Sequence, residues 1–176
     1  MKTLPIWRGK IYLLDADDPW PAVFESYPAI ETLTRELVAT RRVQGTPRRV
    51  GVTSSCQTCG AGEWVAIIGG AFTPRDDDRL VIEVRVGDGD TLEKPIAEEV
   101  LAGALDALER CDRPAGTVVI DRALVHPVDL RLWAFRMAAA TLAEALCGTR
   151  DDASLTAVAT EAFVRRRWGA SAPDAP

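Results

Sequence analysis

The chain has little of what several functional classes require. It contains one histidine, His126, so a Ser-His-Asp arrangement would have to use that residue, and no G-x-S-x-G nucleophile motif accompanies it. No G-x-x-x-x-G-K-[ST] loop occurs either, so GTP hydrolysis is not expected. These absences predict a protein that is not an enzyme and that needs no cofactor.

Long apolar runs and an excess of positive charge are also missing. The longest apolar run, 64–72, is far too short to cross a bilayer, and the N-terminal sequence MKTLPIWRGK has no apolar signal region. Lysine and arginine number 21 against 26 aspartates and glutamates, and the net charge is −5. This balance argues against a dedicated duplex-binding protein held by phosphate contacts. We expect a cytoplasmic protein without membrane contact.

The 4 cysteines do not form a metal-binding pattern. Cys56 and Cys59 make a C-x-x-C pair, but Cys111 and Cys147 lie too far apart to supply the second pair of a zinc ribbon. The glycines that follow Cys59 and the apolar run after them indicate a loop entering a strand, unlike the helix start of a thioredoxin-type site. The sequence predicts reduced thiols and no bound metal.

The chain length predicts one ordinary domain, or one domain with a small appendage. The chain has 176 residues, of which 47% are hydrophobic, which is enough for a core. Strands are expected over 10–14, 49–54, 64–72, 80–86 and 117–120, and helices over 28–40, 94–110, 130–146 and 155–168. This order is typical of an α+β fold, a mostly antiparallel sheet with two helices, 94–110 and 130–146, side by side on one face. The low-complexity tail 169–176 is expected to be disordered.

The histidine lies between an expected strand and an expected helix. Pro127 favours an extended backbone at His126, and Asp129 stands where a helix N-cap would accept a backbone N–H bond. Apolar residues at helical spacing follow from Leu130. The pattern predicts that His126 is displayed at the tip between strand and helix.

Four segments, in order, resemble the end of the third domain and the fourth domain of elongation factor G. Residues 126–139 resemble the family pattern H-x-V-D-S-x-E-x-A-F-x-x-A-A, with Leu130 and Leu132 in place of its serine and glutamate, and 57–64 are similar to its glycine-rich loop K-Q-T-G-G-x-G-Q-Y-G. Residues 100–109 resemble the helix V-x-x-G-I-x-x-A-L, and 30–53 resemble the close of the third domain. Tetracycline-resistance ribosomal protection proteins carry the same kind of domain.

The resemblance implies a division of the chain and a site. Residues 1–54 would correspond to the end of the third domain, 55–148 to the fourth domain with its left-handed β-α-β unit, and 149–176 to a C-terminal helix and tail. A stand-alone module of this kind, without a GTPase domain, would bind the ribosome or another structured RNA. The resemblance assigns those contacts to the glycine-rich loop and the tip, through Gln57, Gly60, Gly62 and His126.

The departures from the family pattern support a second hypothesis. Cys59 replaces the first glycine of the loop. Only Arg122–Val125 separate Asp121 from His126, about six residues fewer than in the family, which shortens the tip by about 10 Å. Because a fold does not carry a function by itself, the alternative is a protein-interaction or regulatory module that keeps the fold and has lost ribosome binding.

Overall fold

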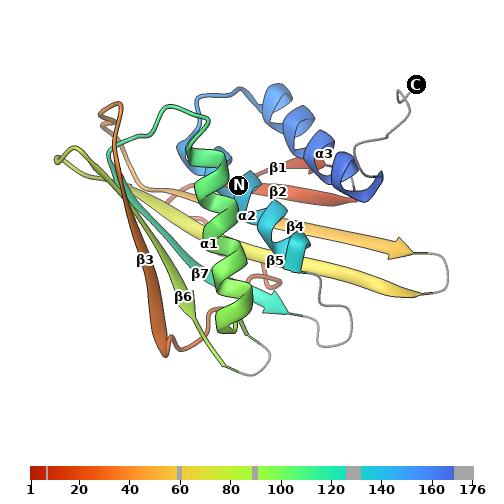
Figure 1. Cartoon of the computed structure of the whole chain (residues 1–176). Helices are drawn as coiled ribbons and strands as arrows, with labels where there is room; N and C mark the ends of the chain where they lie inside the picture. Colours follow the sequence, from red (N-terminus) through yellow and green to blue (C-terminus); the bar gives the residue numbers. More distant parts are fainter. Residues whose placement is uncertain (7, 59–60, 89–90, 126–131, 169–176) are drawn as a thin grey trace.

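The computed structural model describes the chain except residues 7, 59–60, 89–90, 126–131 and 169–176, and it describes only the backbone of 55–58, 61–65 and 163–168. The described residues form a 7-stranded sheet and three helices (Figure 1). In chain order the elements are β1 (Lys2–Ile6), β2 (Gly9–Leu14), β3 (Glu31–Val38), β4 (Arg48–Thr58), β5 (Ala61–Pro74), β6 (Arg79–Val86), α1 (Lys94–Leu108), β7 (Gly116–Val125), α2 (Leu132–Cys147) and α3 (Asp152–Trp168).

The sheet is mixed, and its strand order is β1-β2-β4-β5-β7-β6-β3. β6 and β7 pair in parallel, whereas every other neighbouring pair of described strands is antiparallel. A parallel pair cannot be joined by a tight turn, and here α1 provides the connection from β6 to β7. The predicted α+β class is therefore confirmed.

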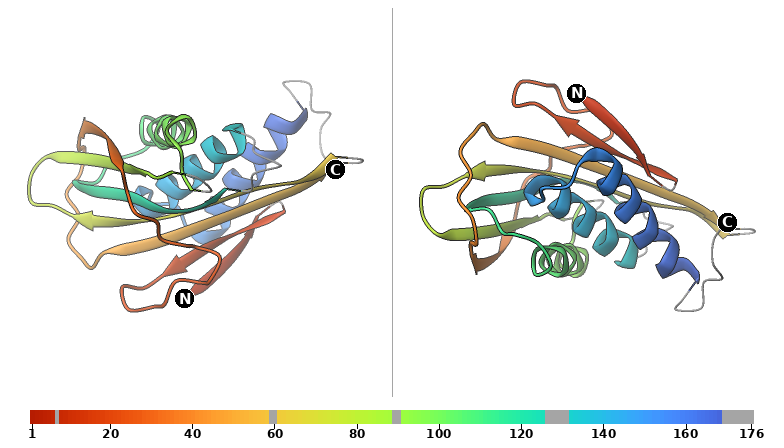
Figure 2. Two further views of the ribbon diagram at one scale, coloured as in Figure 1. Left: turned by 90° about the horizontal axis from the view of Figure 1, so that it is seen from below. Right: turned by 90° about the horizontal axis from the view of Figure 1, so that it is seen from above.

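The helices lie in a row across one face of the sheet (Figure 2). α3 contacts β1, α2 contacts β4 and β5, and α1 contacts β6 and β3. The core lies between these two layers and is mostly aliphatic, with Phe135, Ile68 and Leu142 among its fully buried side chains. Within the described residues, no helix has both the length and the apolar character to span a membrane.

The two long helices expected side by side do contact one another, and a glycine permits their close approach. A β-carbon at Gly103 of α1 would lie 2.1 Å from the carbonyl oxygen of Arg136 on α2. Next to this crossing, the Arg136 guanidinium donates hydrogen bonds to Asp106 at 2.7 Å and to Glu99 at 3.3 Å. A side chain at position 103 would force the two helix backbones apart.

On the opposite face of the sheet, residues 15–30, which we call the strap, lie against β4, β5 and β7. Strand side chains alternate between the two faces, and Val50 and Val52 belong to the core under the helices, so Gly51 faces the strap. A β-carbon at Gly51 would lie 2.3 Å from the Phe24 ring, which is only 3% exposed. The missing side chain makes room for an aromatic ring from the strap.

The helix predicted over 28–40 is wrong, because this segment contains strand β3. Leu33 and Leu37 are four residues apart, a spacing that places two side chains on one face of either a helix or a strand. Ile30 was the third member of the predicted helical stripe, but it is 68% exposed and does not share their environment. The β-branched residues Thr32 and Thr34 were the signal for a strand.

The other expected strands and helices are present, mostly with longer strands than predicted, and strand β1 was not anticipated. Residues 1–54 contribute β1, β2, β3 and part of β4 to the same sheet as the rest of the chain. The predicted boundary at residue 54 falls inside β4. The predicted disordered tail, 169–176, lies outside the described residues.

Candidate nucleic-acid interface

Strands β4 and β5 extend past both of their neighbours. The pairing of β2 with β4 reaches only to Ser54, and the pairing of β7 with β5 begins only at Ala66. Beyond these points, in the described part of the chain, 55–58 and 61–65 pair with each other alone. We call this projecting hairpin the arm; Figure 1 shows it at the right of the sheet. Four extended residues make it about 13 Å long.

The structure describes the backbone at two of the four predicted site residues. Gln57 lies on β4 opposite Glu63 of β5, and Gly62 lies on β5 beside an irregularity of the pairing between Gln57 and Thr58. Gly60 and His126 lie outside the described residues. Val125, the last residue of β7, stands opposite Ala66, so β7 runs towards the arm and ends near its root.

The arm carries almost no charge. Its sequence over 55–65 is SCQTCGAGEWV, in which Glu63 is the one carboxylate and no lysine, arginine or histidine occurs. An RNA phosphate bound at the arm would therefore have to accept hydrogen bonds from uncharged donors, either backbone N–H groups, which glycines leave accessible, or polar side chains such as that of Gln57. Cationic contacts would have to come from residues at the arm's root.

Cationic side chains do lie at the root of the arm, around a hollow of about 410 Å³. It is lined by Arg8, Gly9, Lys10, Tyr12, Val23, Thr53, Ser54 and Ile67. Lys10 is exposed and sits opposite Thr53 in the pairing of β2 with β4. The Tyr12 ring packs edge-on against Phe24 of the strap, with 5.3 Å between ring centroids. The hollow thus combines positive charge with an aromatic ring, a combination that suits a nucleic acid.

Two further arginines near the strap are already engaged. The guanidinium carbons of Arg49 and Arg122 each lie 4.8 Å from the ring centroid of Trp20. Arg49 also donates hydrogen bonds to the carbonyl oxygens of Ala16 at 2.8 Å and Asp18 at 2.7 Å. These arginines hold the strap against the sheet, so we do not count them among the candidate ligand contacts.

The described cysteines lack the features of a catalytic or metal-binding thiol. Cys147 is buried, and desolvation raises the pKa of its thiol to about 12. Burial also raises the pKa of Cys111, which is partly exposed. Thiols with raised pKa values stay protonated at neutral pH and are poor nucleophiles and ligands. Among the described residues, no group of three or more histidine, cysteine, aspartate or glutamate side chains could hold a metal ion.

Sequence reasoning predicted a glycine-rich loop between two strands but neither the projecting arm nor the hollow at its root. Lys10 and Thr53 are distant in sequence and come together only because β2 pairs with β4. The available signal was the alternation of Lys10 and Tyr12 in an expected strand, which places both on one face.

The chain is an α+β protein with a projecting hairpin, and comparison with known proteins assigns it no family. No protein-family model matches the chain, and a search of curated proteins finds no match.

Proposed function

We propose that this chain is a non-enzymatic, translation-factor-like module that binds the ribosome or another structured RNA through the arm and the hollow at its root. The observation that carries the proposal is the arm itself. It extends about 13 Å beyond the strands on either side, and glycines occur at positions 60 and 62 of its sequence. A projecting loop of this kind can enter an RNA groove that the body of the protein cannot reach.

The element order supports the resemblance on which the proposal rests. From β4 onward the chain runs strand, strand, strand, helix, strand, helix, and the segments that resemble the family's loop and two helices fall on the β4–β5 hairpin, α1 and α2. We infer that β6, α1 and β7 form the left-handed β-α-β unit of the fourth domain of elongation factor G. A cytoplasmic location and independence of any cofactor are part of the same proposal.

The chemistry of the site predicts a particular kind of RNA binding. With few cations near the arm and a net charge of −5, few phosphates would be neutralised, so affinity should depend only weakly on salt. For one or two phosphate contacts the logarithmic salt slope would lie between about −1 and −2. Shape and backbone hydrogen bonds would carry most of the recognition.

The test is co-sedimentation of the purified protein with ribosomal subunits over a series of salt concentrations. The double variant Gln57→Ala/His126→Ala and the single variant Lys10→Glu should each weaken binding without lowering the melting temperature, because the altered groups are predicted to face the RNA. Arg42→Glu is the matched control. Arg42 is an exposed cation paired with Asp78 near the β5–β6 turn, at the opposite end of β5 from the arm.

The lack of lysine and arginine in the arm favours a second candidate function, a protein-interaction module. Trp64 and Val65 give the arm apolar residues that a protein partner could bury. If the wild-type protein fails to sediment with ribosomal subunits at any salt concentration, the RNA proposal is wrong and the protein-interaction module takes its place. Binding that survives all the arm and Lys10 variants would contradict the site while leaving RNA binding intact.

A further inference from the structure

The two edges of the sheet differ in how they are protected. Strand β1 contains Pro5, and α3 contacts it, with an ion pair between Lys2 and Asp152. Strand β3 contains neither proline nor glycine, and among the described strands it pairs only with β6. An open edge strand presents unpaired backbone groups to any second strand. Of the two edges formed by the described strands, the β3 edge is therefore the less protected.

The outward backbone groups of β3 can be identified from its hydrogen bonds. The N–H of Ala39 donates to the carbonyl oxygen of Asp78 at 3.1 Å. In the pairing of β3 with β6, Val38 lies opposite Arg79, so the next pair along the two chains is Ala39 and Asp78. The N–H of Ala39 therefore points towards β6. Because inward and outward groups alternate along a strand, Thr32, Thr34, Glu36 and Val38 point their N–H and C=O groups away from β6. The Thr34 carbonyl, consistent with this, accepts a hydrogen bond of 3.0 Å from the Arg35 guanidinium.

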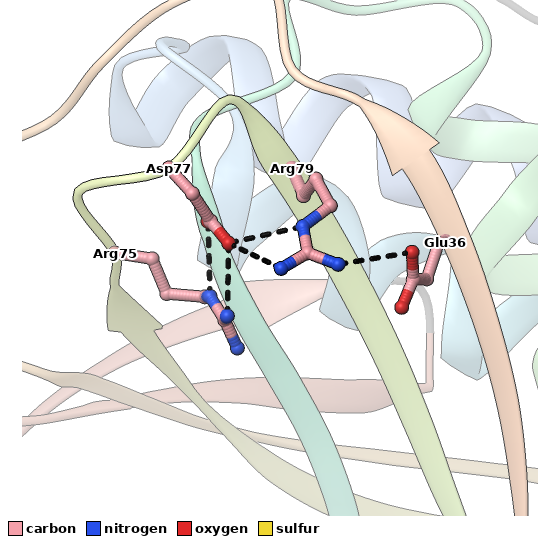
Figure 3. A network of polar contacts seen from close by, with 4 residues as sticks. All are labelled: Glu36, Arg75, Asp77 and Arg79. Carbon is pink, nitrogen blue, oxygen red and sulfur yellow. Dashed lines mark hydrogen bonds and ion pairs between the residues drawn. The ribbon is translucent and has the colours of Figure 1, made fainter.

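The same edge carries the two most exposed large hydrophobic side chains among the described residues. Val38 is 72% exposed at the end of β3, and Ile30 is 68% exposed just before its start. Along the strand itself, charged residues are held by their neighbours. Figure 3 shows Arg79 of β6 reaching Glu36 at 3.5 Å while it also contacts Asp77. The features of this edge that remain without a partner among the described residues are its outward N–H groups, its outward carbonyl groups other than that of Thr34, and its apolar ends.

We propose that β3 pairs with β3 of a second copy of this chain, antiparallel about a two-fold axis at Thr34, so that the sheet continues across two molecules. A two-fold axis perpendicular to the sheet places Thr34 opposite Thr34 of the other copy and Thr32 opposite Glu36. It also brings each Val38 to the end of β3 of the other copy, next to the exposed side chain of Ile30, whose own N–H donates to the Val86 carbonyl oxygen at 2.9 Å. The two exposed aliphatic side chains at each end then cover one another. Isologous contacts of this kind are the commonest in homo-oligomers.

Other registers are less favourable. An axis at Arg35 would set two arginines directly opposite each other, and an axis at Glu36 would do the same with two glutamates, which is destabilising. An axis at Leu33 would leave Val38 beyond the start of the partner strand. The register at Thr34 alone covers the whole strand without opposing like charges.

A contact along one strand is smaller than a standard protein interface of about 1,200–2,000 Å², so the dimer should dissociate on dilution. The dimer leaves the arm free. In Figure 1, β3 lies at the left end of the molecule and the arm projects at the right end. The pairing is therefore independent of the proposed RNA binding.

The first experiment measures the mass of the protein in solution by sedimentation equilibrium, up to about 1 mM, the concentration at which even a weak contact is half populated. We expect a wild-type dimer that dissociates at low concentration. Thr34→Pro removes an outward N–H that no described residue accepts, and Val38→Lys places a charge at the covered apolar end. Both variants should be monomeric. Val23→Lys, at a hydrophobic residue of the strap that is 38% exposed, should dimerise like the wild type.

A second experiment tests the register by oxidation of single introduced cysteines. Two Thr34→Cys residues would face each other about 5.5 Å apart between α-carbons, within the span of a disulfide, so this variant should form a covalent dimer beyond the wild-type background. Two Val38→Cys residues would lie about 26 Å apart and should not. A wild type that is monomeric up to the highest concentration, a dimer unaffected by the β3 variants, or equal cross-linking through both cysteines would overturn the proposal.

Discussion

The face of the sheet under the helices and the face under the strap are stabilised by different means. Beneath the helices, aliphatic side chains at regular spacing interlock, and Phe135, Ile68 and Leu142 are fully buried. Beneath the strap, glycines in the strands leave space that Phe24 and Trp20 fill from a segment without regular structure. The packing of the helix face therefore depends on apolar side chains at periodic positions. The packing of the strap face depends on a few glycines, whose lack of a side chain makes room for aromatic rings.

The largest effect should come from truncating the helix face. Phe135→Ala removes a fully buried ring from α2 and leaves a cavity, so we expect the free energy of unfolding to fall by about 3–5 kcal/mol. Urea denaturation followed by circular dichroism measures it. Leu132→Ala on the same helix, where the side chain is 40% exposed, is the control. Equal losses from both variants would contradict the burial described here.

Adding a side chain at a glycine of the strap face should lower the free energy of unfolding by less than Phe135→Ala does. Gly51→Ala drives a methyl group into the Phe24 ring, 2.3 Å from the new β-carbon, and overpacking of this kind costs about 1–3 kcal/mol. The Phe24 ring can shift, whereas the backbone of α2 next to Gly103 cannot. In urea denaturation we therefore expect Gly51→Ala to lower the free energy of unfolding by less than Gly103→Ala in α1.

A double-mutant cycle sharpens this prediction. Phe24→Leu alone should destabilise, but in combination with Gly51→Ala it should recover part of the loss, since the two positions share one space. Strictly additive losses in the cycle would show that Gly51 and Phe24 do not contact each other.

A still smaller effect is expected at Trp20. Its ring lies 4.8 Å from the guanidinium carbons of both Arg49 and Arg122, and each partly exposed cation–π contact contributes about 0.5–1 kcal/mol. Trp20→Leu removes the π-system and fills less of the space that the indole occupies, so unfolding should become easier by about 1–2 kcal/mol, whereas Trp20→Phe, which keeps an aromatic ring, should lose less. If Leu and Phe behave alike in thermal unfolding, the cation–π contribution is absent.

At neutral pH the Cys147 thiol on the helix face should have no effect on the pH dependence of stability. Burial raises its pKa from an ordinary value of 9.0 to about 12. Above pH 9 the unfolded chain loses a proton that the folded chain retains, so stability is lost as the pH rises towards 12. Comparing Cys147→Ala with the wild type by denaturation from pH 7 to 11 checks this. The wild-type curve should fall more steeply only above pH 9.

Sequence patterns predicted the parts of the helix face that depend on local periodicity. The stripe of α1 and that of α2 were visible because every third or fourth residue must be apolar where a helix packs on a sheet. The strap was not visible, since no local rule connects Phe24 to Gly51. At β3 the local pattern misled, because the spacing of Leu33 and Leu37 satisfies a helix and a strand equally.

By itself, the sequence determined the α+β class and the positions of the long helices. Each of these follows from interactions within a short stretch of chain. Only the tertiary structure decided that β4 and β5 form a projecting arm, that Lys10 lies at its root and that β3 ends the sheet as an open edge. These features depend on which strands pair and how far each pairing extends, and such choices are made by contacts between residues distant in the sequence.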